Sequence, residues 1–265
     1  MMPTLRHLNG LGLRALTNGA LRRLASTVIV LSVAACAPTS EMLYQTDWRH
    51  GLNSDLSVQA NPGDLSIVPD RGSIKEYALK AKIRRSDDFS QVANGTPRAE
   101  VVFPSSVRFA QGETYGIRWS TMLPLGTQFD NKQFVIVTQI HQSTRYGSPP
   151  LALSIQGTQY GIALRGGEQH DKASATQWIC CADADVGRWV EWELRYRPDE
   201  RGERSITDLY RDGKLVFRAT GARNAYPGDQ KAYLKLGLYK PDWLRKPTET
   251  SDMSMLYGPV TVTKQ

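Results

Sequence analysis

Residues 189–197 read Trp-Val-Glu-Trp-Glu-Leu-Arg-Tyr-Arg, and large apolar side chains alternate with charged ones along the whole stretch. Side chains two residues apart point to the same face of a β-strand. The apolar residues therefore share one face: Val190, Trp192, Leu194 and Tyr196. Residues 208–219 also alternate, on both sides of Asp212-Gly213. Asp-Gly supplies the positive φ angles of a two-residue turn, so this second stretch predicts a β-hairpin.

Short alternating segments of the same kind, bounded by Gly, Pro, Asn and Asp, recur along the chain, whereas helical periodicity is nearly absent. We expect further strands at residues 76–83, 98–103, 114–121, 133–141, 151–156, 160–165, 231–240 and 257–263. This many strands in 265 residues predicts an all-β fold with two antiparallel sheets, a β-sandwich or jelly roll. Since no Pro/Gly/Ser-rich stretch separates domains, we expect one domain over residues 46–265.

The first 35 residues have the composition of an export signal. They contain four arginines, no acidic residue and an apolar run from Ala25 to Ala35. The run ends in Leu31-Ser-Val-Ala-Ala-Cys36, which resembles the lipobox of bacterial lipoproteins. This resemblance implies lipidation of Cys36, a tether over residues 36–45, and sorting to the outer membrane because Ala37 is not an aspartate. A plain secretory signal cleaved near Ala35 or Ala37 is the alternative.

The basic charge of the chain comes largely from this leader. Without residues 1–35, four of the 33 basic residues and none of the 26 acidic ones are lost, so the net charge falls from +7 to +3. The remaining chain has no basic run and no nucleic-acid-binding motif, which argues against a nucleic-acid partner. A mildly basic groove for an anionic glycan is compatible with this charge. We expect a monomer.

Cysteine is scarce in the body of the chain, where Cys180 and Cys181 are adjacent. They could form a vicinal disulfide, but we favour two thiols that point to opposite faces of a strand. No metal-ligand spacing surrounds them, and no cluster indicates a cofactor or a structural calcium ion.

Three predicted strands place strong polar residues two apart. Arg98 and Glu100 share one face of their strand, Gln139 and His141 share a face of the next, and a third strand presents Tyr233, Lys235 and Tyr239. A solvated face would usually carry Lys, Glu, Thr and Ser. Arg, Gln, His and Tyr instead fix orientation and hydrogen-bond sugars, so these faces predict the floor of a binding groove. Gly237 would leave room there for a ligand.

Arg98-Ala-Glu100, Gln139-Ile-His141 and Tyr233-Leu-Lys-Leu-Gly-Leu-Tyr239, in this order, resemble the jelly-roll polysaccharide lyases of the alginate lyase, glucuronan lyase and heparin lyase I group. The likeness runs from about Trp48 to the end of the chain. It implies a concanavalin-like β-jelly roll and the β-elimination of a uronic-acid polymer, which gives an unsaturated uronide end.

The resemblance also implies residue roles. Arg98 and Gln139 would hold the substrate carboxylate and stabilise the charge that develops when the C5 proton leaves. Tyr239 would protonate the leaving oxygen, and either His141 or Tyr239 would be the base, depending on the configuration at C5. Lys235 would bind substrate or tune the tyrosine, or form a salt bridge with Glu100.

The remaining assignments concern the rim of the groove. Glu100 more plausibly orients Arg98 than contacts substrate, although we include it with Tyr233 among the binding residues. Arg145, Tyr146 and Trp178 are candidates for sugar contacts, with a core or surface role as the alternative for each. His50 and His170 are not expected to take part.

Two rival functions remain open. A glycoside hydrolase on the same fold would need two carboxylates that face one groove. Glu191 and Glu193 share a face, but surface exposure explains them better. A carbohydrate-binding lipoprotein without catalysis would not need His141 and Tyr239 together. The substrate polymer is not determined by the sequence.

Overall fold

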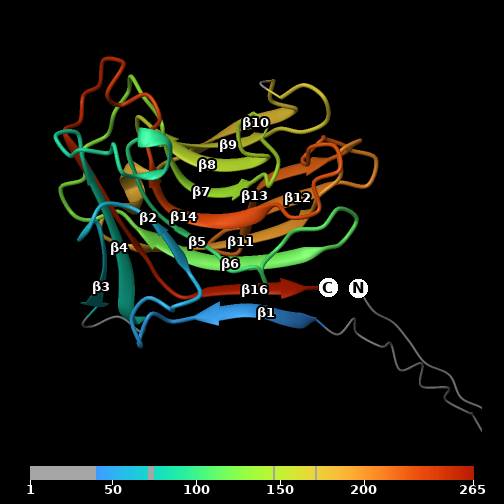
Figure 1. The fold of residues 1–265 in the computed structure, drawn as a ribbon, viewed down its shortest axis with the longest axis horizontal. Helices are drawn as coiled ribbons and strands as arrows, with labels where there is room; N and C mark the ends of the chain where they lie inside the picture. Colours follow the sequence, from blue (N-terminus) through green and yellow to red (C-terminus); the bar gives the residue numbers. More distant parts are fainter. Residues whose placement is uncertain (1–39, 71–74, 146, 171) are drawn as a thin grey trace, which may run out of the picture. The chain divides into compact units, whose positions relative to one another are not determined.

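The computed structural model describes residues 40–70, 75–145, 147–170 and 172–265, and within them the chain forms two antiparallel sheets (Figure 1). The nine-stranded sheet contains β1 (Glu41–Thr46), β3 (Leu65–Asp70), β4 (Glu76–Arg84), β6 (Tyr115–Met122), β11 (Trp189–Arg197), β12 (Ile206–Arg211), β13 (Lys214–Thr220), β15 (Asp252–Tyr257) and β16 (Val260–Lys264). The seven-stranded sheet contains β2 (Ser57–Gln59), β5 (Arg98–Val102), β7 (Val135–His141), β8 (Leu151–Gln156), β9 (Gln159–Leu164), β10 (Ala175–Cys180) and β14 (Tyr233–Tyr239). Two short 3-10 helices, η1 (Ala93–Gly95) and η2 (Asp183–Asp185), lie in connections.

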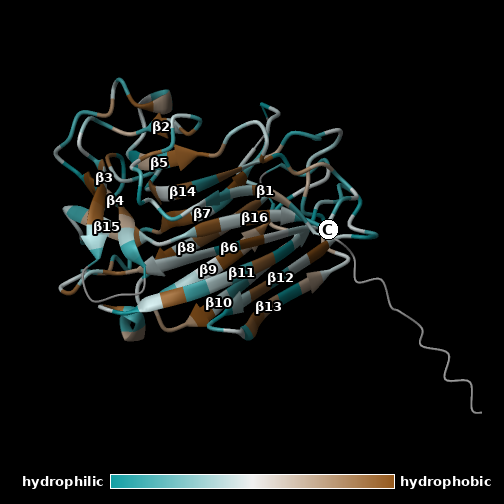
Figure 2. Ribbon diagram, turned by 90° about the horizontal axis from the view of Figure 1, so that it is seen from below, coloured by the Kyte–Doolittle hydropathy of each residue, from teal (hydrophilic) through white to brown (hydrophobic). Residues whose placement is uncertain are grey.

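The core lies between the two sheets and draws side chains from both. The four apolar residues of the opening stretch, all in β11, are at most 2% exposed, and Leu234, Leu236 and Leu238 of β14 are fully buried in the same cluster. Figure 2 shows the alternation of apolar and polar residues along the strands. The predicted all-β sandwich is confirmed.

The seven-stranded sheet has the order β10-β9-β8-β7-β14-β5-β2. β5, β14 and β7, which carry the three polar motifs, are therefore neighbours in space although β5 begins at Arg98 and β14 only at Tyr233 in the chain. Antiparallel pairing sets Gly237 opposite Glu100 and Lys235 opposite Gln139. Sheet topology thus assembles one polar face from three distant motifs.

The predicted hairpin is confirmed at the residue level. β12 and β13 pair across Asp212-Gly213, and both turn residues have positive φ, 50° and 75°. These are the angles that an Asp-Gly turn was expected to supply.

Several strand predictions need correction. The segment predicted at residues 257–263 is divided between β15 and β16, which turn at Gly258 and Pro259. β1 begins at Glu41, so residues 41–45 belong to the sheet rather than to the tether. β1, β2, β3 and β10 were not predicted, because most of their residues are exposed or half-buried and the apolar alternation is weak.

The two adjacent cysteines also differ from the favoured expectation. Cys180, the last residue of β10, and Cys181 are joined in a disulfide. A disulfide between neighbours requires both sulfur atoms on the same side, which the expected alternation of thiols would not allow.

Among the described residues, no helix is long and apolar enough to cross a membrane. The predicted signal segment and Cys36 lie outside the described residues.

Candidate active site

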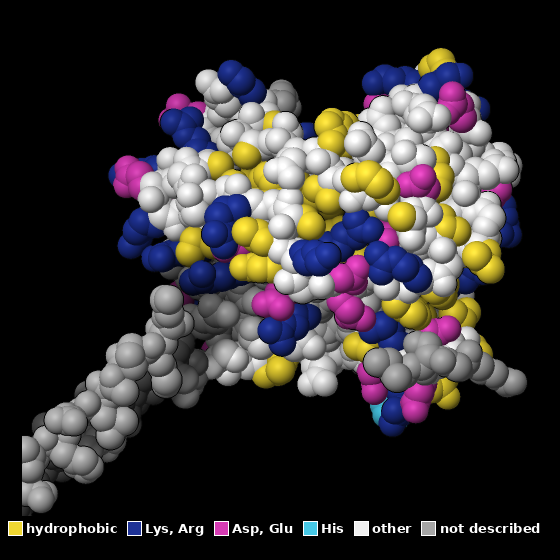
Figure 3. Space-filling view, turned by 180° about the vertical axis from the view of Figure 1, so that it is seen from behind, with side chains coloured by type: hydrophobic (Ala, Val, Ile, Leu, Met, Phe, Trp, Pro, Cys, Tyr) yellow, Lys and Arg dark blue, Asp and Glu magenta, His cyan; other side chains and the backbone are white. Residues whose placement is uncertain are grey.

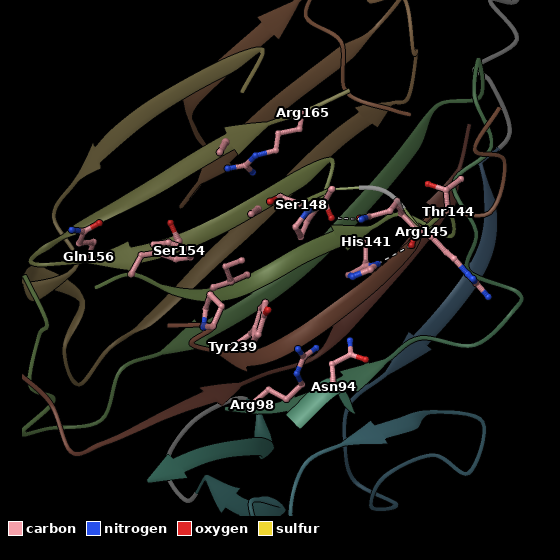
Figure 4. A pocket seen from close by; sticks show the side chains of 18 of the residues that line it. Asn94, Arg98, His141, Thr144, Arg145, Ser148, Ser154, Gln156, Arg165 and Tyr239 are labelled. Carbon is pink, nitrogen blue, oxygen red and sulfur yellow. Dashed lines mark hydrogen bonds between the residues drawn. The ribbon is translucent and has the colours of Figure 1, made fainter. Parts of the chain in front are cut away.

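A groove of about 660 Å³ lies on the face of the seven-stranded sheet that points away from the core (Figure 4). Its polar lining is formed by Asn94, Arg98, His141, Gln142, Thr144, Arg145, Ser148, Ser154, Gln156, Arg165 and Tyr239. Its apolar lining includes Phe134, Ile136, Ala152, Ala163 and Trp178. In Figure 4, Arg98 and Arg165 lie on opposite sides, and Tyr239 and Ser154 lie between them.

Arg98 and Tyr239 form the best-defined contact in the groove. They are paired on β5 and β14, and the Arg98 guanidinium carbon lies 4.0 Å from the centroid of the Tyr239 ring. Arg98 is 5% exposed, and it donates hydrogen bonds to Thr96 Oγ1 and, at 3.4 Å, to Gln59 Oε1. The guanidinium is therefore held rigidly beside a phenol, in a position suited to bind a carboxylate.

Glu100 lies beneath the groove as the acceptor of a buried network. Its Oε2 is 2.5 Å from Lys235 Nζ and 3.4 Å from Arg98 Nη1, and its Oε1 accepts a hydrogen bond from Gln139. Glu100 and Lys235 are each 1% exposed. Burial lowers the pKa of Lys235, and the charge of Glu100 opposes this effect. Two cations and an amide thus surround one buried carboxylate, which fixes the orientation of Arg98.

His141 lies at the end of β7, where its ring stacks on Tyr233 with 5.2 Å between centroids. Its Nδ1 is 2.8 Å from the carbonyl oxygen of Gln142. A carbonyl can only accept, so Nδ1 carries the hydrogen and Nε2 of the neutral ring keeps its lone pair. Burial lowers the pKa of His141, and the positive charges of Lys235 and Arg98 lower it further. The ring is accordingly suited to accept a proton.

Two β-bulges determine which side chains of β7 and β14 face the groove. The pairing of β14 with β7 shifts between Leu236 and Tyr239, and the pairing of β7 with β8 shifts between Ile136 and Thr138. As a result Ile136 and His141 both line the groove, although five positions apart they would face opposite sides of a regular strand. Ile136 lies opposite Tyr239, and His141 lies opposite Tyr233.

Tyr257 connects these bulges to the other sheet. This residue of β15 is fully buried, and its hydroxyl lies 2.8 Å from the carbonyl oxygen of Val137 and 2.9 Å from that of Gly237. Both carbonyls belong to the irregular parts of the two strands. The core side of the sheet thereby supports the geometry of the groove side.

Gly237 has a role other than the one expected. Its φ is 138°, and a Cβ at this position would lie 2.1 Å from the carbonyl oxygen of Ala99 on β5. The glycine therefore allows two strands to approach each other at the bulge, rather than leaving room for a ligand.

The structure brings together Arg98, His141, Tyr239 and Arg145 as groove-lining residues. Gln139, Glu100 and Lys235 lie beneath the groove, and none of them is more than 1% exposed. Direct contact of these three with a sugar is not supported by this arrangement, because they are covered and already bonded to one another. Of the roles expected for Lys235, the structure contains the salt bridge with Glu100. Tyr233 supports His141, and Tyr146 lies outside the described residues.

Sequence reasoning missed several lining residues. Ser154 and Gln156 alternate with the core residues of β8, so the spacing rule that selected the other strands could have found them. Arg165 directly follows β9, on the groove side. Asn94 lies in η1 with a φ of 61°, and nothing in its local sequence marks it.

Among the described residues, the groove lining contains no Asp or Glu side chain. Glu191 and Glu193 are paired with Lys75 at 2.6 Å and with Arg118 at 3.1 Å, on β11 of the other sheet. Across the described residues, no three His, Cys, Asp or Glu side chains gather closely enough to hold a metal ion.

Comparison with known proteins gives a consistent assignment. Residues 44–258 match the family described as polysaccharide lyase. An endo-β-1,4-glucuronan lyase from Trichoderma reesei has a similar structure, with a TM-score of 0.67 and 18% identity over 80% of this chain and 91% of that one. Alginate lyase A1-II′, of polysaccharide lyase family 7, follows with a TM-score of 0.52 and 15% identity over 78% and 85%. Alginate lyase AlyA1 from Zobellia galactanivorans has a TM-score of 0.51 and 14% identity over 78% and 82%. No curated protein sequence matches the chain.

Proposed function

The chain belongs to the polysaccharide lyase family and is an enzyme of that class, and from this premise we propose that it cleaves a uronic-acid polymer in the groove beside Tyr239. The observation that carries the proposal is the contact between Arg98 and Tyr239, 4.0 Å apart in a groove that also presents His141. It combines a cation for a carboxylate with two groups that can transfer protons.

The reaction is a β-elimination. A base takes the C5 proton of a uronate, the electron pair forms the C4–C5 double bond, and the bond from C4 to the linking oxygen breaks. The leaving oxygen takes up a proton. Because the carboxylate on C5 must absorb negative charge as the proton leaves, a charge-assisted hydrogen bond to Arg98 stabilises the transition state.

Tyr239 is the acid in this proposal, because its ring lies against the guanidinium that holds the carboxylate. His141 takes the C5 proton through Nε2 when that proton faces it, since Nδ1 is committed to the Gln142 carbonyl. For the opposite configuration at C5, Tyr239 serves as both base and acid. Glu100, Lys235 and Gln139 hold Arg98 in place from below.

The substrate class follows from the relatives and from the groove. The similar structures are named for glucuronan and alginate, both polymers of uronic acid. Arg98, Arg145 and Arg165 all line the groove, which suits a chain with one carboxylate in each sugar.

A panel of glucuronan, polymannuronate, polyguluronate and heparin tests the proposal through the ultraviolet absorbance of the unsaturated product. We expect turnover on at least one of these polymers and a loss of about 10²- to 10⁴-fold in Tyr239→Phe, the range typical of general acid–base catalysis. Tyr210→Phe, on β12 of the other sheet, is the matched control and should keep full activity. Absence of product with every polymer, or an active Tyr239→Phe, would refute the proposal.

We further propose that the protein is exported as a lipoprotein and anchored to the outer membrane by lipidated Cys36. The basic leader, the apolar run and the small residues before Cys36 support this location. Mass spectrometry of the mature amino terminus would identify an acylated Cys36, and an unmodified terminus at another residue would contradict it.

A further inference from the structure

One straight row of residues crosses the seven-stranded sheet from the catalytic centre to its far edge. Strand register pairs Tyr239 with Ile136, Ile136 with Ser154, Ser154 with Gly161, and Gly161 with Trp178. All of these except Gly161 line the groove. The groove therefore runs across the strands, from β14 to β10.

Trp178 lies at the far end of this row with an unusually open side chain. It is 56% exposed, although it lines the groove. Its ring lies over Gly161, because a Cβ at that glycine would be 2.9 Å from Trp178 Cζ3. An indole that rests on backbone with its other face open is a platform on which a sugar ring can stack.

The surroundings of Trp178 leave room for a polymer. Between the platform and Tyr239 the groove is lined by the small side chains of Ala152, Ser154 and Ala163. Arg165, which follows β9 and bonds through its backbone N–H to Pro150, lines the groove four residues along the chain from Gly161, and its buried Nε has no hydrogen-bond partner within the described part of the chain. The groove thus offers an aromatic face and a guanidinium, the two kinds of group that bind the ring and the carboxylate of a uronate polymer.

We propose that Trp178 forms a distal subsite that binds one uronate residue of the polymer, away from the bond that is cleaved, and that Arg165 binds a carboxylate of the same polymer. The proposal rests on the proposed function, because it assumes that the occupant is a uronate chain. Trp178 stacks on a pyranose ring, and Arg165 binds a carboxylate of the bound polymer.

The spacing of the strands sets the position of this subsite along the polymer. Gly161, beneath the indole, is three strands from Tyr239, which corresponds to about 14 Å at the usual strand separation. A pyranose in an extended 4-linked chain advances by roughly one strand spacing. The stacked sugar is therefore about three residues from the cleaved linkage, and dimers cannot reach it.

Chain-length dependence tests the subsite. For the wild type, we expect kcat/KM on purified oligoglucuronates or oligomannuronates of two to eight residues to rise once the chain reaches Trp178. In Trp178→Ala this rise should fall by about tenfold, equivalent to ~1.4 kcal/mol, while the shortest cleaved oligomer keeps its rate. Trp178→Phe should retain part of the gain, and Arg165→Gln should reduce it for long chains. Trp189→Ala, on the other sheet, is the control that should leave the length dependence unchanged.

Calorimetric binding of the same oligomers separates failure of the subsite from failure of the proposed function. If the wild type binds hexamers but forms no unsaturated product, and Trp178→Ala weakens that binding, the subsite stands and the lyase proposal falls. If the wild type cleaves the polymer while Trp178→Ala loses nothing, or loses equally at every length, the subsite is overturned and the lyase proposal stands.

Discussion

The surroundings of His141 in the groove shift the charge state of its ring. Burial and the positive charges of Lys235 and Arg98 disfavour the protonated ring. The Gln142 carbonyl and the charge of Glu100 offset this only in part, so the pKa lies below the ordinary histidine value of 6.5. A base must be unprotonated to act. The lowered pKa thus keeps His141 ready over a wider range of pH.

For a substrate that uses His141 as the base, we expect the acid limb of the kcat/KM profile to lie below pH 6.5. The free energy of unfolding should also decrease as the pH falls through this range. As the pH falls, this histidine is protonated in the unfolded chain before it is protonated in the folded chain. The contribution of the neutral ring to folding stability is therefore complete above about pH 6.5 and is lost as the pH approaches the folded-state pKa. His170→Gln should leave the limb unchanged. An acid limb above pH 7 would contradict the assignment.

At the scale of the strands, the two adjacent bulges decide which residues share the groove. An ordinary pairing of β14 with β7 would set Tyr239 opposite Val135, which is buried in the core cluster. The bulges replace it with Ile136 on the groove face. Tyr257 holds the carbonyls of both bulges from the core side.

Tyr257→Phe should therefore affect catalysis without touching substrate. Loss of the hydroxyl removes the one donor that the two buried carbonyls share, at a cost of about 1–3 kcal/mol in unfolding free energy. We expect kcat to fall by about tenfold or more because small displacements of reacting groups are costly, while KM stays within about twofold.

Tyr196→Phe is the matched control for this change. Tyr196 is also fully buried, and its hydroxyl donates to the Asn224 carbonyl, away from the bulges. It should lose comparable stability in chemical denaturation and keep kcat. Equal effects of the two variants on kcat would show that only global stability is involved.

At the scale of the whole molecule, a buried ion pair joins two of the loops that connect the strands. Lys240 follows β14 and lies 2.5 Å from Asp130, in the connection before β7, and both side chains are at most 5% exposed. Burial alone would raise the pKa of Asp130, but hydrogen bonds from Lys240 and Thr248 outweigh it and lower the pKa to about 2. The connection that follows Tyr239 is thereby tied to the groove strand β7.

Asp130→Asn should destabilise the protein by about 3 kcal/mol at pH 7, because it leaves Lys240 buried without its counter-charge. The wild-type contribution is present above pH 4 and lost as pH falls toward 2, so the difference should shrink on acidification. Urea unfolding at pH 7, 5 and 3 measures this. As a control, Asp242→Asn breaks the ion pairs of Asp242 with the exposed side chains of Arg245 and Lys246, and it should cost no more than about 1 kcal/mol. A loss of stability in Asp130→Asn that does not change with pH would contradict the assignment.

Charge on the molecular surface is mixed rather than concentrated on the face shown in Figure 3, where basic side chains lie among acidic ones. This agrees with the moderate net charge of +3 over residues 36–265.

The sequence by itself determined the class of fold, the strands with strong alternation, the Asp212-Gly213 turn and the polar motifs of β5, β7 and β14, because each depends on neighbours along the chain. Tertiary structure alone decided the strand order, the bulges that bring Ile136 and His141 to one face, the burial of Gln139 and Lys235 against Glu100, and the row from Tyr239 to Trp178. These depend on contacts between strands far apart in the chain. Residue spacing within one strand gives the face of a side chain, whereas its depth and its partners are set by the strands that pack beside it.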